Sequence, residues 1–466
     1  TLDAVRHHDM HCRQRGPVRW LARWINLPQF ARGQSRNRLQ AGAGAGTFAA
    51  KQGTGTTMQQ ARLAGEGKGS WLDDPVHRAW LVRDARRSLD FFDASAGADG
   101  FVPLDAAGRP LAAVQELHAT TRLVHSFALG QMAGRPDRAG IIDRGMDLLW
   151  RGHRDARHGG YVWSLRDGTV ADGTKLAYGH VFVLLAASTA KLAGHPDADR
   201  LLTDAAQVLE DRFWDNDAGL FRDEFTRDWQ VFSTYRGMNA NMHGVEALLA
   251  AHEATADGEY LRRAGGILDF FIAGQAARNG WRIPEHYDAD WRPDPGYEGN
   301  PMFRPGGTTP GHSFEMARLL LQWWDLAGRP DAQAPRQARL LVETALSDAW
   351  LAQGGLAYTL DHGGRVARSD RYWWPVTEAI GALAALIKLD PRPEDEDWYR
   401  RMWRFADAHL IDHARGGWFP EPGGTAGAQF QGKPDIYHAL QADLFPLVPG
   451  LSRHGQALIH TKPLAS

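Results

Sequence analysis

The sequence predicts an all-α fold, an (α/α)6 toroid or barrel with short β-hairpins at one end. Three observations predict it. A turn made of Gly followed by an aromatic residue or Leu returns six times at a nearly constant interval. Pairs of stretches with apolar residues at helical spacing separate these turns. Some of the turns end in Asp-Gly after alternating residues, which is typical of a hairpin.

The repeated turn sets the number of units. It occurs at Gly100-Phe101, Gly160-Tyr161, Gly219-Leu220, Gly280-Trp281, Gly355-Leu356 and Gly417-Trp418. The intervals between these turns are 60, 59, 61, 75 and 62 residues. A period of this size indicates a repeat architecture, in which each unit buries its apolar face against its neighbours. Six helix pairs therefore predict one large domain with an inner ring, an outer ring and a pocket at one mouth.

The elements between the turns follow the same plan. Apolar residues recur at helical spacing from Trp80 to Phe92, and later stretches repeat this pattern. Residues 159–168 alternate and end on Asp-Gly, and residues 354–364 repeat that design, so both segments predict hairpins. The long fourth interval holds an insertion, residues 287–307, that is rich in Pro and Gly. We expect this insertion to form a lid or substrate loop.

Composition divides the chain into three parts. Residues 1–68 carry many Arg and Gly, the single cysteine (Cys12) and no repeated turn, so we expect a disordered or non-native N-terminal extension. Native translation is expected to start at Met58. Residues 69–452 are expected to form the barrel domain, and residues 453–466 a C-terminal tail.

The composition also argues against several classes of function. The 53 basic and 55 acidic residues leave a net charge of −2, which gives no support for nucleic-acid binding. Apolar runs stay short of the roughly 18 residues that a membrane span needs, so we expect no membrane partner. One cysteine excludes an internal disulfide framework and favours a reducing, cytoplasmic location. The sequence has neither a phosphate-binding loop nor a dinucleotide fingerprint, and we expect no cofactor.

A residue that can carry chemistry follows each turn, 19 to 32 positions later. These residues are Arg122, His180, His243, His312, Trp374 and His438. They stand near the N-terminus of the second predicted helix of each repeat. If those helices form the inner ring, the side chains converge on its axis. The positive end of a helix disfavours imidazolium, so a His placed there tends to stay neutral and able to act as a base.

Two repeats share a His-x-x-Glu pair, His243 with Glu246 and His312 with Glu315. Residues three apart share a helix face, so each carboxylate can hold the imidazole or bond a substrate hydroxyl. The fifth and sixth repeats keep a polar residue at a similar place, namely Glu378 and Gln441. A lone His is usually structural, but several in register across repeats favour a catalytic role.

Three other interpretations remain open at this point. A metal site is disfavoured because neither Glu-x-x-His nor His-Glu-x-x-His occurs, and we expect no metal. A glycoside hydrolase would need two carboxylates flanking one bond, for which Glu224, Glu285 and Glu246 are candidates, but the residues in register are His. A non-enzymatic sugar-binding scaffold would need Trp and Arg, but no set of facing imidazoles.

The chain also resembles a known family, on motifs that extend from about Trp71 to Pro449. The motifs are Thr120-Thr121-Arg122, Lys175-Leu176-Ala177-Tyr178-Gly179-His180, Asn239-Ala240-Asn241-Met242-His243 with Glu246, Phe303-Arg304-Pro305 with Gly311-His312 and Glu315, Trp374 with Glu378, and Lys433-Pro434-Asp435-Ile436-Tyr437-His438. The sequence resembles the N-acylglucosamine 2-epimerase superfamily, whose fold is the (α/α)6 barrel. Within it, the chain is most similar to the branch of aldose–ketose isomerases that interconvert D-mannose and D-fructose without a metal.

The resemblance implies an isomerase that acts on a monosaccharide through a cis-enediolate. It implies that His438 is the base at C2, that His243 serves ring opening, that Glu246 orients the reacting groups and that Arg122 stabilises the enediolate. The substrate-binding residues that it implies are His180, Asn241, His312, Glu315, Trp374, Glu378 and Arg304. The alternatives are a sugar 2-epimerase (N-acylglucosamine, cellobiose or mannose/glucose type), a sulfoquinovose isomerase and, less favoured, a helical-toroid glycoside hydrolase. The protein is expected to be a monomer or a homo-oligomer.

Overall fold

The computed structural model describes residues 62–65, 69–97, 100–111, 114–297, 299, 304–424, 430, 432–433 and 436–465. The chain divides into two units, Thr1–Gln60 with Glu298–Pro305, and Ala61–Tyr297 with Gly306–Ser466. Residues 1–61 of the predicted N-terminal extension lie outside the described residues. Part of the predicted lid does as well. Everything below concerns the second unit.

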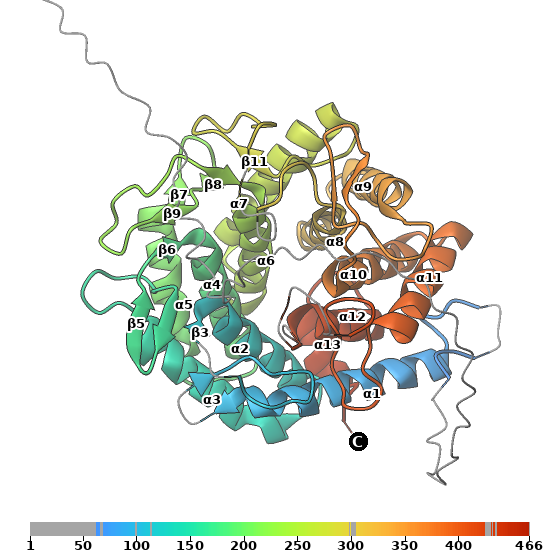
Figure 1. The fold of residues 1–466 in the computed structure, drawn as a ribbon, viewed down its shortest axis with the longest axis horizontal. Helices are drawn as coiled ribbons and strands as arrows, with labels where there is room; N and C mark the ends of the chain where they lie inside the picture. The colour runs from blue at the N-terminus through green and yellow to red at the C-terminus, as the bar shows by residue number, and fades with distance from the viewer. Residues whose placement is uncertain are drawn as a thin grey trace, which may run out of the picture. The chain divides into compact units, whose positions relative to one another are not determined.

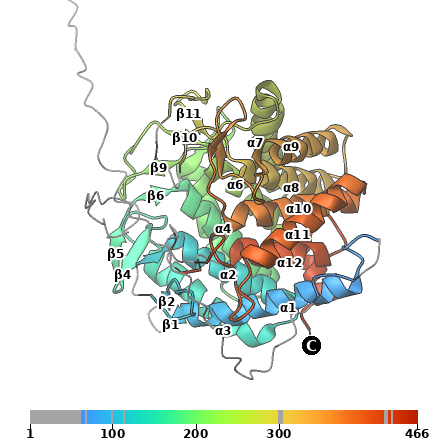
Figure 2. The ribbon, with the colours of Figure 1, turned by 45° about the vertical axis from the view of Figure 1, so that its right-hand side comes forward.

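Two concentric sets of helices build this unit (Figure 1). The inner helices are α2 (Leu117–Met132), α4 (Ala177–Leu192), α6 (Met238–Thr255), α8 (Pro310–Leu326), α10 (Trp373–Leu389) and α12 (Tyr437–Leu447). The outer helices are α1 (Pro75–Phe92), α3 (Ala139–Leu148), α5 (Ala198–Val208), α7 (Gly258–Leu268), α9 (Gln333–Ala349) and α11 (Pro393–His409). Successive inner helices pack side by side, and each outer helix packs on an inner one. The predicted (α/α)6 fold is confirmed, as the turned view in Figure 2 also shows.

The two rings differ in how their helices bury side chains. Outer helix α5 buries Ala198, Leu201, Leu202 and Ala205, which form a single stripe on one face. Inner helix α10 is buried over nearly its whole circumference, since it packs against its ring neighbours and an outer helix at once. A helix that is apolar all round is stable only when it is buried on all sides. The apolar pattern of the sequence therefore assigns each helix to its ring.

Short strands lie between the outer helices α1, α3, α5, α7 and α9 and the inner helices that follow them. They are β1 (Ala96–Gly97), β2 (Gly100–Phe101), β3 (Gln115–Glu116), β4 (Ser164–Arg166), β5 (Thr169–Asp172), β6 (Lys175–Leu176), β7 (Trp214–Asp215), β8 (Leu220–Phe221), β9 (Glu224–Phe225), β10 (Arg236–Gly237), β11 (His286–Tyr287), β12 (Thr359–Leu360) and β13 (Val366–Arg368). All pairings are antiparallel, in the orders β1-β2, β3-β4-β5, β6-β9, β7-β8, β10-β11 and β12-β13. Because the strands precede the inner helices, they gather at the end of the ring where those helices begin.

The Asp-Gly hairpin is formed as predicted. Arg166 pairs with Thr169, so the turn has two central residues. Both of them, Asp167 and Gly168, have positive φ, of 50° and 70°. This conformation matches the right-handed twist of the flanking strands, and Asp-Gly adopts it readily.

The repeated turn has one geometry in several units. Its Gly N–H donates to the carbonyl oxygen of an Asp four residues earlier, in the pairs Gly159–Asp155, Gly219–Asp215 and Gly416–Asp412. The sequence pattern aligns Gly219 with Gly160. The hydrogen bonds instead make Gly219 equivalent to Gly159, which is one residue earlier. In two repeats a buried lysine just before the next inner helix binds the Asp of this turn. Lys175 binds Asp155, and Lys433 binds Asp412.

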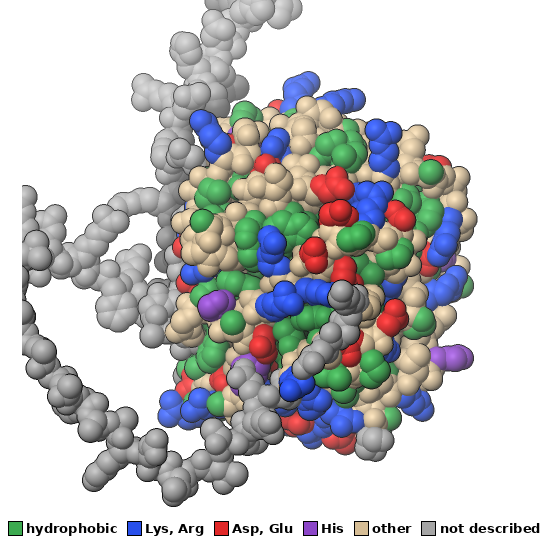
Figure 3. All heavy atoms as spheres, turned by 90° about the vertical axis from the view of Figure 1, so that its right-hand side faces the viewer, with side chains coloured by type: hydrophobic (Ala, Val, Ile, Leu, Met, Phe, Trp, Pro, Cys, Tyr) green, Lys and Arg blue, Asp and Glu red, His purple; other side chains and the backbone are tan. Residues whose placement is uncertain are grey.

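The last residues belong to the packed unit. Residues 453–466, expected as a tail, contain α13 (His454–Thr461), which packs against α2 and α4. The N–H of Leu464 donates to the carbonyl oxygen of Ala133 at 2.7 Å. Among the described residues, none of the helices has the length and apolarity that a bilayer crossing requires. The face in Figure 3 intersperses basic and acidic side chains rather than gathering one sign of charge.

Several histidines are buried in neutral form in the helix packing. Burial lowers the pKa of His77, His125 and His153 to about 4, and that of His180 to about 3. An unfolded chain protonates these groups near pH 6.5. The unfolded state therefore binds more protons than the folded state between pH 6.5 and 4, so the stability of the fold decreases as pH falls through that window.

We expect His153→Phe to reduce this acid sensitivity. Phe213 occupies the equivalent position one repeat later, since Val162 N–H donates to His153 O and Arg222 N–H donates to Phe213 O, both at 2.8 Å. Removing one buried titrating group should recover about 2 kcal/mol of the stability lost between pH 7 and pH 5. Denaturant unfolding at both pH values measures it, with the exposed His460→Gln as control. If His153→Phe lost as much unfolding free energy between pH 7 and pH 5 as the wild type does, the lowered pKa of His153 would be contradicted.

Candidate active site

The first turns of the inner helices carry the predicted site residues, but not at one position. Arg122 and His243 are the sixth residues of α2 and α6, and His180 is the fourth of α4. His312 is the third residue of α8, whereas Trp374 and His438 are the second residues of α10 and α12. Since four residues make about one helical turn, side chains at these different positions point in different directions around their helices. Their common place near the helix start is confirmed, but they are not structurally equivalent.

A buried chain of three groups positions His438. Its Nδ1–H donates to Oε1 of Glu378 at 2.8 Å. The other carboxylate oxygen, Oε2, accepts from Nη2 and Nε of Arg318 at 3.0 and 3.3 Å. All three side chains are nearly inaccessible to solvent, with 6% of the His438 side chain exposed and 2–3% of the other two. The imidazole is therefore held in one tautomer, with Nε2 left as its accepting nitrogen.

Three carboxylates share the neighbourhood of Arg318. Burial alone would raise the pKa of Glu378, but Arg318 and the hydrogen bond from His438 hold it below its usual value. Burial raises the pKa of Glu315 well above its usual range, and the charges of Glu378 and Glu246 raise it further. The surroundings of Glu315 therefore favour its neutral form, whereas those of Glu378 favour its charged form. Two like charges in a low dielectric favour a proton on one of the carboxylates.

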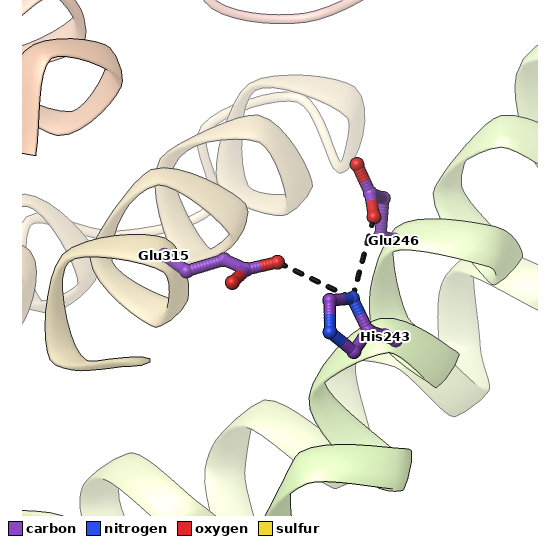
Figure 4. A group of neighbouring side chains, drawn as sticks. All are labelled: His243, Glu246 and Glu315. Carbon is purple, nitrogen blue, oxygen red and sulfur yellow. Dashed lines mark ion pairs between the residues drawn. The ribbon is translucent and has the colours of Figure 1, made fainter. Parts of the chain in front are cut away.

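His243 faces two of these carboxylates (Figure 4). Its Nδ1 lies 3.4 Å from Oε1 of Glu315, which projects from α8, and 3.7 Å from Oε2 of Glu246 on its own helix. Burial lowers the pKa of His243 to about 4, and the nearby Glu246 opposes that shift only in part. The imidazole is thus neutral at pH 7 and able to accept a proton.

Glu246 is held by residues of α12. Its two oxygens accept from the hydroxyl of Tyr437 and, at 3.2 Å, from Nε2 of Gln441. Burial alone would raise the pKa of Glu246, but the neighbouring His243 and Arg318 hold it below its usual value. The carboxylate is therefore charged and fixed, and it links α6 to α12 across the ring.

Arg122 is clamped between aromatic rings. Its guanidinium carbon lies 4.7 Å from the ring centre of Phe182 and 4.8 Å from that of Tyr437. Its Nη2 donates to the hydroxyl of Tyr178 at 2.8 Å. This arrangement fixes a buried positive charge close to His243, which suits a group that stabilises negative charge on substrate oxygens.

The rim of the site is more exposed. His312 and Trp374 are both half-buried, and their rings are 5.1 Å apart at an interplanar angle of 34°. Trp374 also lies 6.1 Å from the ring of His438. The predicted pairing of His312 with Glu315 is wrong. His312 Nδ1 instead binds Glu285 at 2.9 and 3.0 Å, whereas Glu315 faces His243 and Arg318.

His180 and Asn241 bind backbone groups of their own repeats. His180 is completely buried, its Nδ1–H donates to Leu176 O at 2.7 Å and its Nε2 accepts from Tyr161 N–H at 2.9 Å. Asn241 is also completely buried and accepts from Phe221 N–H at 2.7 Å. Both therefore anchor the turn of their own repeat. Asn241 Nδ2 also donates to the carbonyl oxygens of Phe221 and Gly237, at 3.1 and 3.0 Å, so backbone groups bind the polar atoms of both side chains. The predicted contact of these two residues with substrate stays a prediction.

Arg304 belongs to the other unit of the chain, with Glu298–Pro305, and is described apart from the ring. Its predicted contact with substrate stays a prediction.

The cluster His243, Glu246 and Glu315 has the composition of a metal site, since its possible ligand atoms lie within 4.8 Å of one another. Two observations argue against that use. The guanidinium groups of Arg122 and Arg318 already place positive charge beside these residues. Glu246 also accepts hydrogen bonds from Tyr437 and Gln441. The donor set therefore fits proton transfer better than a divalent cation.

A cavity of about 70 Å³ lies behind the charged cluster. Glu246, Arg318 and Gln441 line it, and its far wall includes Glu253 and His454 near α13. Its size is sufficient for a few water molecules. Leu129, Leu249 and Phe445 also line it, so its wall is mostly apolar, and the cavity lies on the side away from His312 and Trp374.

Sequence reasoning missed Arg318 and Tyr437 as site residues, and it named Glu285 only as a candidate carboxylate of a glycoside hydrolase. Arg318 stands three residues after Glu315, so the same helical spacing that singled out Glu315 places it on that face. Tyr437 directly precedes His438. Glu285 had no local signal, because its partner His312 lies 27 residues away.

Comparison with known proteins agrees with this geometry. The model of the family described as N-acylglucosamine 2-epimerase matches residues 100–442. The chain belongs to this family. It is 39% identical over 396 residues to the D-mannose isomerase of Thermobifida fusca, covering 81% of this chain and 96% of that protein.

Solved structures of family members also superpose on this chain. A crystal structure of D-mannose isomerase matches with a TM-score of 0.74 and 31% identity, over 79% of this chain and 97% of the other. The cellobiose 2-epimerase of Spirochaeta thermophila DSM 6192 matches with a TM-score of 0.71 and 23% identity, over 79% and 95% of the two chains. The second likeness supports the family fold alone.

We expect Arg318→Met to reduce both stability and activity. It leaves buried carboxylates without their cation, which costs about 3–5 kcal/mol of folding free energy, and it releases Glu378 from its place beside His438. Arg339→Met is the matched control, because Arg339 binds Asp395 at 2.8 Å in a buried pair between outer helices α9 and α11. Denaturant unfolding should show losses in both variants, whereas kcat should fall, by about 100-fold or more, only in Arg318→Met.

If Arg318→Met fails to fold, Arg318→Lys serves instead, since it keeps the charge but not the planar fork that binds Glu378. A kcat equal to that of Arg339→Met would contradict the role of Arg318 in positioning His438.

Proposed function

We propose that this protein is an aldose–ketose isomerase that interconverts D-mannose and D-fructose. One observation carries the proposal: an imidazole oriented by a carboxylate, His438, stands near a neutral imidazole, His243, and a clamped guanidinium, Arg122. This set supplies a base, a second proton-transfer group and a fixed positive charge. Two relatives that are 39% identical to this chain are D-mannose isomerases, which supports mannose as the substrate.

The reaction begins on the open-chain aldose. Nε2 of His438 accepts the proton from C2, the electrons of that C–H bond form the C1–C2 double bond, and the electrons of the C1–O1 double bond move onto O1, which gives a cis-enediolate. His243 accepts the proton of the O2 hydroxyl and passes it to O1. The electrons left on O2 then form the ketose carbonyl as His438 returns its proton to C1. Arg122 stabilises the negative charge that develops on O1 and O2. General-base catalysis of this kind contributes about 10²–10⁴ in rate.

His243 serves the proton transfers at oxygen. Because it is neutral and flanked by charged Glu246 and neutral Glu315, it can both accept and release a proton. This chemistry suits ring opening, in which one oxygen gains a proton and another loses one. The expected roles of His243, Glu246 and Arg122 therefore have a common geometric basis.

A sugar 2-epimerase is the second candidate. Epimerisation needs proton donors on both faces of C2, and His243 with His438 could supply one each. Isomerisation needs only one face and transfer to C1. The product and the position of solvent-derived hydrogen distinguish the two reactions.

We expect proton NMR of the enzyme with D-mannose in D₂O, with EDTA present, to show fructose and deuterium at C1. Glucose with deuterium at C2 would indicate the epimerase instead. Failure of EDTA-treated enzyme, restored by a divalent ion, would contradict metal-independent proton transfer.

The matched variant is His438→Asn, which should lower kcat by about 10²–10⁴-fold. His460→Gln, at an exposed position, controls for loss of a histidine. Unchanged turnover by His438→Asn would exclude it as the base.

A further inference from the structure

Glu285 is a buried carboxylate that the steps above do not use. Only 5% of its side chain is exposed. Its Oε1 accepts from His312 Nδ1 at 2.9 Å and from the backbone N–H of Thr309 at 3.1 Å, and its Oε2 lies 3.0 Å from the same His312 nitrogen. Its backbone carbonyl accepts from Met238 N–H at 3.0 Å. One residue thus binds the starts of α6 and α8 and one imidazole.

This contact fixes the state of His312. A carboxylate that accepts from Nδ1–H holds the ring in one tautomer and leaves Nε2 as the accepting nitrogen. The ring is also packed on Trp374. Gly311 permits this packing, because a Cβ at that position would lie 2.2 Å from Cζ3 of Trp374. His312 is therefore held by Glu285 at one nitrogen and by the indole at its side.

The pair has the same design as Glu378 with His438. In each pair a buried carboxylate accepts from Nδ1–H, and both imidazoles lie beside Trp374, at 5.1 and 6.1 Å between ring centres. They differ in depth, since 14% of the His312 side chain is exposed against 6% of that of His438. A sugar that lies against this indole can reach His438 with one end and His312 with the other.

We infer that Glu285 is a positioning residue for substrate binding: it presents Nε2 of His312 to a sugar hydroxyl remote from C1 and C2. This inference rests on the proposed isomerase function. His312 then contributes equally to binding the substrate and the transition state. An interaction of that kind lowers KM and leaves kcat nearly unchanged, unlike the groups that transfer protons.

Steady-state kinetics with D-mannose tests the inference through a double-mutant cycle. His312→Gln should raise KM about tenfold with kcat within threefold of wild type, and Glu285→Gln should do nearly the same. The double variant should be no worse than His312→Gln within about twofold, because Glu285 acts through His312. If the two substitutions acted independently, KM of the double variant would rise about 100-fold, and this result would overturn the inference. A fall in kcat as large as the rise in KM would also overturn it.

Glu253→Gln is the matched control for the other role of Glu285, in which its carboxylate accepts a hydrogen bond from a backbone N–H at the start of a helix. Glu253 is a half-buried carboxylate that also accepts a backbone N–H, from Gln456 at 2.8 Å in α13, and its hydrogen bond serves no histidine. Its substitution should lower the melting temperature as Glu285→Gln does, but leave KM unchanged. A KM rise in both variants would mean that helix anchoring alone explains the effect.

Nitrogen-15 NMR of the histidine side chains tests the pair without turnover. Wild-type His312 should be in the Nδ1–H tautomer, and Glu285→Gln should populate the other tautomer. An Nε2–H tautomer in the wild type would overturn the inference even if the enzyme isomerises mannose. The expected tautomers in an enzyme without isomerase activity would refute the proposed function and, with it, the binding role, while confirming the Glu285–His312 contact.

Discussion

The site depends on one buried cation, Arg318. A guanidinium in the interior is unfavourable unless carboxylates compensate it, and isolated buried carboxylates are equally unfavourable without it. Arg318 binds Glu378 at 3.0 Å and lies 3.9 Å from Glu315. With Arg122 it balances two charged carboxylates, which leaves Glu315 neutral. This balance keeps Glu378 charged, and a charged Glu378 holds His438 in the tautomer that its role requires.

The ring makes this arrangement possible. Glu315 and Arg318 come from α8, Glu378 from α10, and His438 from α12, so each contact joins neighbouring inner helices. All of these helices begin at the hairpin end, because the repeated turn precedes each of them. The rim, with His312 and Trp374, is half-exposed, whereas the charged cluster beneath it is nearly closed to solvent. In this account the rim of the ring binds substrate, and the buried cluster beneath it transfers protons.

Sequence reasoning predicted what is local or periodic. The turn interval predicted the fold, and the His243–Glu246 spacing predicted a contact that exists at 3.7 Å. It failed where the partner lies beyond one helical turn in the sequence. His312 is only the third residue of α8, and its carboxylate comes from the preceding loop. His180 shares the helix start with the site residues, but it lies on a face that points to its own turn. Which face meets the axis depends on ring packing, and no short motif contains that information.

Neutron diffraction at neutral pH would test the charge balance most directly, since it locates exchanged deuterium on individual side chains. We predict deuterium on a carboxyl oxygen of Glu315 and on Nδ1 of His438, and none on Glu378. Deuterium on Glu378 with a bare Glu315 would contradict the account. In that case Arg318 would not keep Glu378 charged, and the orientation of His438 would need another cause.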